Sequence, residues 1–289
     1  MKYINLNYKP PTESSNLFVA FKGWPDAGES ATNTLDYLRK EKNGKSLATI
    51  DPEEFFDFVR IRPQIRRIND NSREIIWPKN EFFYFSDSES KRTGNIILLG
   101  MEPSLKWRTF CNLIIDLAMN NGIKRVIFVG SLLDGVPHSR NPLLSGFATN
   151  DSLDKLLHEK GIYPSTYEGP TGISSAIMEA CLKNNLEYVS IWGHVPHYLE
   201  ASPNYRVSFA MLAILTSLFD LSLDINKMSQ LAFDFDLQIK DVIEESEEMR
   251  NYVKKLEKEY DQKSIFDNID SPSLDLVQDL EEFLRKRKN

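Results

Sequence analysis

The chain has 289 residues, of which 41% are hydrophobic and 27% charged, and its formal net charge is −7. This balance is typical of a globular protein and excludes disordered and fibrous classes, while the acidic charge disfavours nucleic acid as a general partner. The first residues lack the apolar core of a signal peptide, and no apolar run approaches the ~18 residues of a membrane span, so we expect a cytoplasmic protein without membrane contact.

Four short apolar segments that each end at a glycine are predicted to be buried strands. They are rich in Val, Ile and Phe and do not alternate strictly with polar residues, which is typical of strands buried on both faces of a parallel sheet. The segments are residues 17–23, 95–100, 125–130 and 188–193.

Helical patterns lie between these strands, as parallel strands require. This alternation predicts a doubly wound or related α/β sheet. The expected helices span residues 28–42, 103–121, 151–160 and 171–185.

Residues 53–85 fit this alternation of strands and helices less well. Residues 60–64 and 81–85 are candidates for extra strands, antiparallel at one edge of the sheet. Four arginines make the stretch locally basic, and it is either a solvated face or a patch for an anion or a partner; they are Arg62, Arg66, Arg67 and Arg73.

The C-terminal part changes character, because charged residues become dense after a buried helix at 207–223. Residues 241–263 carry a narrow apolar stripe typical of a long amphipathic helix, and residues 274–288 predict a second helix after a linker at 268–273. We therefore divide the chain into an α/β domain at 1–225 and a C-terminal helical appendage at 226–289, which we expect to pack on its own domain or on a neighbouring subunit.

Polar and charged residues follow each predicted strand, where ligands bind in open α/β sheets. Three of the four histidines lie in these loops. Since the carboxyl ends of parallel strands share one edge, we expect one cleft there, with Glu102 nearby and with His138 and His197 beside Asp26. The candidate catalytic residues are Asp26, Asp134, His138, His194 and His197.

Each of these residues also has a structural interpretation. Asp26 suits a helix cap, Asp134 precedes Gly135 in a common turn pair, and a histidine here could simply bind neighbouring backbone. A metal site would need a third ligand beside His194 and His197, and we predict neither a metal nor a cofactor.

A second candidate site lies at residues 168–175, where small residues open a helix. Unpaired N–H groups at a helix N-terminus attract anions, although plain capping is the alternative. The candidate ligand-binding residues here and in the neighbouring loops are Gly23, Trp24, Glu102, Gly169, Thr171, Gly172 and Ser174.

Taken together, these motifs resemble the proteasome assembly chaperone 2 family. Their order and spacing match from residue 17 to residue 285. The matching segments are residues 23–28, 100–103 with Trp107, 134–140, 169–173, 195–199, 202–204 and 280–285.

The resemblance implies a three-layer α/β/α fold with a mostly parallel sheet, similar to purine-nucleoside phosphorylases. It also implies a homo-oligomer, with a trimer favoured, and a protein-binding or assembly factor with a protein partner of the proteasome type. Eukaryotic members use a C-terminal hydrophobic-Tyr-any tripeptide, whereas this chain ends Arg287-Lys288-Asn289, so we do not expect that mode of docking.

The alternative is an enzyme or small-molecule-binding protein at the strand ends. A histidine with a nearby carboxylate would then form an acid/base pair for hydrolysis or group transfer on a small anionic metabolite.

Overall fold

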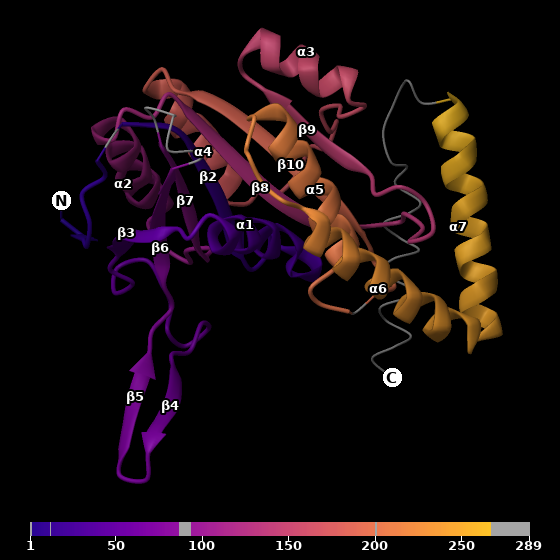
Figure 1. Ribbon diagram of the computed structural model, residues 1–289, viewed down its shortest axis with the longest axis horizontal. Coiled ribbons are helices and arrows are strands. Elements are labelled where there is room, and N and C mark those ends of the chain that lie inside the picture. The colour runs from indigo at the N-terminus through magenta and orange to yellow at the C-terminus, as the bar shows by residue number, and fades with distance from the viewer. Residues whose placement is uncertain (1, 12, 87–93, 200, 267–289) are drawn as a thin grey trace.

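The computed structural model describes residues 2–11, 13–86, 94–199 and 201–266 (Figure 1). Its centre is an eight-stranded sheet that runs across the molecule. The strands lie in the order β1 (Ile4–Leu6), β3 (Lys45–Ile50), β6 (Asn80–Ser86), β7 (Gly94–Met101), β2 (Ser14–Lys22), β8 (Arg125–Asp134), β10 (Glu187–Pro196) and β9 (Leu144–Ala148).

The four strands predicted from the apolar segments form the middle of the sheet. β7, β2, β8 and β10 pair in parallel, and side chains such as Phe18 and Val19 are fully buried. The remaining pairings, at the two edges, are antiparallel. The α/β class is therefore confirmed, but the sheet as a whole is mixed rather than mostly parallel, because β6 and β9 run antiparallel to the central strands beside them.

Helices cover both faces of the sheet and give the three layers. α2 (Trp107–Asn120) and α4 (Ile173–Lys183) pack on one face. The other face is covered by α1 (Ser30–Glu41), which follows the short 3-10 helix η1 (Ala27–Glu29), by α3 (Asp151–Glu159) and by α5 (Tyr205–Leu218).

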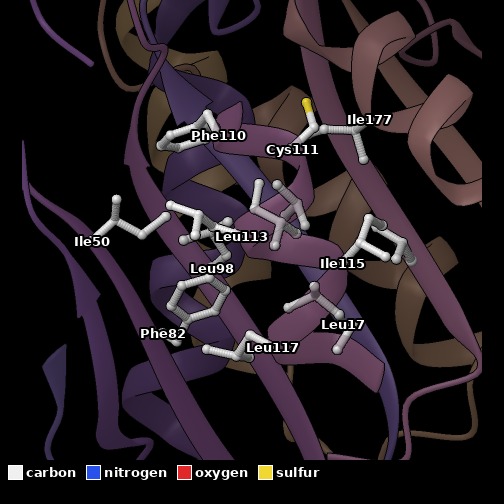
Figure 2. Close-up of a cluster of buried hydrophobic side chains, with 14 of the residues drawn as sticks. Leu17, Ile50, Phe82, Leu98, Phe110, Cys111, Leu113, Ile115, Leu117 and Ile177 are labelled. Atoms are coloured by element: carbon white, nitrogen blue, oxygen red, sulfur yellow. The ribbon is translucent and has the colours of Figure 1, made fainter. Parts of the chain in front are cut away.

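On one face of the sheet, side chains of α2 pack against side chains of the strands beneath it. Figure 2 shows Phe110, Leu113 and Leu117 of α2 directed at Leu98 of β7 and Phe82 of β6. The apolar side chains of α2 recur at helical spacing, so one face of this helix is apolar and buries itself on the sheet.

A two-stranded antiparallel hairpin projects from this body (Figure 1). We call it the arm; it consists of β4 (Gln64–Asn69) and β5 (Ser72–Ile76), which form a sheet of their own. Of the two extra strands expected here, 81–85 lies within β6 and is antiparallel as predicted, although β6 lies between β3 and β7 and not at the edge. Residues 60–63 are irregular, and β4 begins at Gln64.

The C-terminal helices are α6 (Asn226–Glu244) and α7 (Glu247–Phe266). The sequence pattern predicted one helix over 241–263, but the structure breaks it at Glu245 and Ser246. The bend lets Val253 and Leu256 of α7 pack against Phe235 of α6. The predicted linker at 268–273 and helix at 274–288 lie outside the described residues, and the division at residue 225 stays a prediction.

Within the described ranges, no helix combines the length and the apolar composition that crossing a membrane requires.

Phe110 provides a test of the α2 core. Its ring is fully buried and lies 5.3 Å from the ring of Phe55 and 5.9 Å from that of Phe21. We expect Phe110→Ala to lower the free energy of unfolding by about 3–5 kcal/mol in urea titrations, because it leaves a cavity. Met119→Ala on the same helix is the control, since Met119 is 53% exposed, and should change stability by at most about 0.5 kcal/mol. Equal losses in the two variants would contradict this packing.

Candidate functional site

Asp26 caps a helix. Its Oδ1 accepts hydrogen bonds from the backbone N–H groups of Ala31 (2.9 Å) and Thr32 (3.0 Å), and its Oδ2 accepts the Thr32 hydroxyl (2.5 Å). These donors belong to the first turn of α1, whose N–H groups have no partner within the helix. Burial raises the pKa of Asp26 to about 6, against the effect of these hydrogen bonds. No histidine is among the partners of Asp26 in the described part of the chain, and the capping interpretation fits its geometry.

His194 and Asp134 form a hydrogen-bonded pair at the ends of β10 and β8. The distance from His194 Nδ1 to Asp134 Oδ2 is 2.7 Å, and the parallel register of the two strands places Pro196 opposite Asp134. The other ring nitrogen, Nε2, lies 2.8 Å from Ser145 Oγ on β9. Asp134 Oδ1 accepts the N–H of Gly135 (2.6 Å), so both of its oxygens are engaged.

Ser145 was not among the residues predicted from the sequence. It lies on β9, a short edge strand in a segment for which no element was predicted. The only available signal was the alternation of apolar and small residues in Leu144-Ser145-Gly146-Phe147-Ala148, which is a weak strand pattern.

His138 and His197 bind tyrosines. The hydroxyl of Tyr198 accepts the backbone N–H of His138 and lies 2.8 Å from its Nδ1. His197, which is 7% exposed, hydrogen-bonds through Nδ1 to the carbonyl of Asp134 (3.0 Å) and through Nε2 to the hydroxyl of Tyr252 on α7 (2.9 Å). Burial lowers the pKa of His138, which favours the neutral ring.

Helix α7 clamps the loop that follows β8. Arg140 in this loop forms two hydrogen bonds to the Asp261 carboxylate, with N–O distances of 2.9 and 2.7 Å, and a third to Glu257 (3.3 Å). Ser139 donates to Glu257, and Tyr260 donates to the carbonyl of Asn141. The loop and the helix therefore form one polar interface.

Little space remains around these histidines. The pocket lined by His138 and His194, together with Arg140 and Arg206, has a volume of about 10 Å³. That is the room of roughly one water molecule. Four of the five predicted acid/base residues thus lie near one another at the ends of β8 and β10, where their own packing fills that pocket, whereas Asp26 follows β2 and binds α1.

The second group of candidates meets at the start of α4. Glu102 Oε1 accepts the N–H of Ile173 (2.9 Å), and the N–H of Trp24 also hydrogen-bonds to this carboxylate. Burial raises the pKa of Glu102, while these two hydrogen bonds oppose the shift. A Cβ at Gly172 would lie 2.9 Å from the Trp24 ring and 3.1 Å from Glu102 Oε1, so a larger residue there would have to displace the exposed Trp24 ring.

The helix N-terminus therefore holds a carboxylate of the protein itself. Gly23, with φ of +116°, turns the chain so that Glu102 packs against it. Thr171 hydrogen-bonds to Ser175, while Ser174 is buried and its carbonyl accepts the hydroxyl of Tyr188. Gly169 lies against the ring of Tyr167. Anion binding by these residues stays a prediction, and the capping alternative accounts for the contacts.

A larger groove lies elsewhere. It has a volume of about 650 Å³ and runs beside α1 at the carboxyl ends of β2 and β7. Side chains of both charges line it, among them Lys22, Glu29, Arg39 and Lys79, and it contains none of the predicted site residues. In the residues that the structure describes, no three His, Cys, Asp or Glu side chains are arranged to hold a metal ion.

The chain matches a known protein family. The model of the PAC2 family matches residues 20–257 of this chain. Among curated proteins, none matches.

Several proteins of known structure are also similar to this chain. A PAC2 family protein from Streptomyces avermitilis is 30% identical over 83% of this chain and 100% of its own, with a TM-score of 0.74. A proteasome-assembly chaperone homologue from Mycobacterium tuberculosis is 28% identical over 82% of this chain and 99% of its own, with a TM-score of 0.74. An archaeal proteasome activator from Pyrococcus furiosus, 15% identical over 83% of this chain and 97% of its own with a TM-score of 0.64, shares the fold.

The pKa of Asp26 predicts a pH dependence of stability. Because this pKa rises from 3.8 to about 6 on folding, the folded chain binds more protons than the unfolded chain between these pH values. The contribution of Asp26 to stability therefore falls as the pH rises from about 4 to 6, by at most about 3 kcal/mol. We expect Asp26→Asn to remove this fall in urea titrations across that range.

Asp36→Asn is the matched control. Burial opposes ionisation of Asp36, but Lys40 and Arg39 lower its pKa overall. Its contribution is therefore lost as the pH falls, the opposite sign to Asp26. Parallel pH profiles for the wild type and Asp26→Asn would show that the Asp26 carboxyl is not perturbed.

Proposed function

This chain belongs to the PAC2 family, and on that premise we propose that it is a protein-binding assembly factor with a partner of the proteasome type. The Mycobacterium tuberculosis homologue and the Pyrococcus furiosus activator, both linked to proteasomes by their descriptions, support this choice. The proposal includes a cytoplasmic location and a homo-oligomer, with a trimer favoured.

The observation that carries the homo-oligomer in this proposal is a set of exposed isoleucines on the arm. Ile65 is 69% exposed, Ile68 59% and Ile75 56%, and Ile65 lies directly opposite Ile75 across the two strands. A lone two-stranded hairpin is at best marginally stable in water. Exposed apolar clusters of this kind are typical of protein interaction sites, so a partner that covers the arm would also stabilise it.

Charge favours a second copy of this chain as that partner. Residues 60–77, which are the arm with its flanking residues, contain five arginines against Asp70 and Glu74, a net charge of +3, so the rest of the chain carries −10. Glu74 pairs with Arg66 and Asp70 with Arg67, whereas Arg62 and Arg73 have no ion-pair partner among the described residues. This basic segment with its exposed isoleucines is complementary to the acidic remainder of another subunit.

The packing of the strand ends supports binding over catalysis at His138 and His197. His138 and His197 use their ring nitrogens to hold Tyr198, the Asp134 carbonyl and Tyr252, and the pocket beside them has room for about one water molecule.

Self-association through the arm can be tested by native mass spectrometry and light scattering. We expect the wild type to be an oligomer and the double variant Ile65→Ser, Ile75→Ser to dissociate. Burial of one isoleucine contributes about 1.5–3 kcal/mol, so the pair should weaken association at least about 100-fold. Val242→Ser on α6 is the control, since Val242 is 62% exposed and lies outside the arm. A wild type that stays monomeric at high protein concentration would rule out the arm as a self-association surface.

The assembly function needs a separate experiment. Purified full-length chain is mixed with recombinant proteasome α-subunits of its source organism and followed by native mass spectrometry. We expect a complex of defined stoichiometry and faster formation of α-subunit rings. If the ring forms at the same rate with and without the chain and no complex is seen, the assembly function is wrong, even if the chain is an oligomer.

A further inference from the structure

A serine, a histidine and an aspartate form one hydrogen-bonded row at the β9 edge of the sheet. Asp134, His194 and Ser145 come from three adjacent strands, with distances of 2.7 Å from Asp134 Oδ2 to His194 Nδ1 and 2.8 Å from His194 Nε2 to Ser145 Oγ. The row lies near one edge of the sheet, and β3 and β6, the strands next to the arm along the chain, lie toward the opposite edge (Figure 1).

The chemistry of the row fixes the direction of its hydrogen bonds. A carboxylate only accepts, so Asp134 takes the Nδ1 proton of the neutral imidazole. Nε2 then carries the lone pair and accepts from the Ser145 hydroxyl. This is the tautomer in which an imidazole can remove the proton of a serine, with the carboxylate orienting the ring.

The backbone holds the row rigidly. Asp134 is fixed through Oδ1 by the N–H of Gly135, and the N–H of His194 donates to the carbonyl of Leu143 (3.0 Å) just before β9. All three residues belong to strands, which position side chains more precisely than loops do.

Solvent reaches the row. Ser145 is partly exposed, and the side chains of His194 and Asp134 are 12% and 23% exposed. β9 is the last strand of the sheet, and beyond it an isolated bridge joins Ser145 to Tyr163. Trp192 lies directly opposite Ser145 on β10, and its ring covers Gly130 of β8 and packs against Phe128, on the side away from β9.

We propose that Ser145 is an activated nucleophile that accepts the acyl group of small carboxylic esters. His194 is the base and Asp134 a positioning residue. Ser145 Oγ bonds to the carbonyl carbon while its proton moves to His194 Nε2; the ester C–O bond then breaks and the leaving alkoxide takes that proton. Water cleaves the acyl-serine in the same way, which releases the acid and restores the serine. This activity goes beyond the proposed function and does not depend on it.

The test uses a fluorophosphonate probe, which forms a stable adduct with activated serines. We expect one adduct per full-length chain by intact-protein mass spectrometry, located at Ser145 by peptide mapping, and slow hydrolysis of p-nitrophenyl acetate. Ser145→Ala should abolish both, and His194→Gln should lower the labelling rate about 100-fold or more, since glutamine cannot act as the base. Asp134→Asn should lower this rate and alter its dependence on pH.

The control is Ser46→Ala. The Ser46 hydroxyl also lies on a strand and donates to a carboxylate, Glu81 (2.6 Å), but no histidine is among its hydrogen-bond partners in the described structure. This variant should be labelled like the wild type. An unlabelled wild type, or labelling that persists in Ser145→Ala, overturns the proposal. If Ser145→Ala and His194→Gln lower the melting temperature while the wild type is not labelled, the row only joins β9 to the sheet.

Discussion

The parallel pairing of β7, β2, β8 and β10 is the constraint on which the rest of the structure depends. These strands are buried on both faces, so their backbone groups must pair with each other and their order cannot slip without exposing apolar side chains. Parallel strands need crossover helices, and these form the two outer layers. The same pairing brings four strand ends to one edge, where every candidate site residue from the central loops is found.

At that edge, the protein satisfies its own polar groups. The first turn of α1 receives the Asp26 carboxylate, and the first turn of α4 receives that of Glu102. The histidines beyond β8 and β10 are likewise bound, to Tyr198, to Tyr252 and to Asp134. Unpaired buried donors are costly, so a loop region that looks chemically rich in the sequence can be a structural network.

Local sequence signals predicted the centre of the fold well and its edges poorly. Continuous apolar runs identified the four central strands because burial on both faces leaves a strong pattern. β9 was missed because it is short and includes Ser145 and Gly146, and the break between α6 and α7 was missed because neither Glu245 nor Ser246 is a helix breaker. The residues that meet in the site could be named from the strand ends, but which of them bind each other depends on register and packing. Ser145 reaches His194 only through the pairing of β9 with β10, which no local pattern reveals.

The clamp between α7 and the loop after β8 has a thermodynamic consequence. Two contacts hold α7 against the end of β8. Arg140, in the loop after β8, binds Asp261 of α7, and His197 bridges Tyr252 of α7 and the carbonyl of Asp134. A molecule that prefers the docked helix must therefore also stabilise the end of β8, and one that pulls the helix away must loosen it. By linkage, a ligand at the end of β8 that changes the affinity for that molecule has its own affinity changed by the same factor. α7 and the carboxyl end of β8 are thus two coupled sites, and a ligand bound at one of them changes the affinity for a ligand at the other.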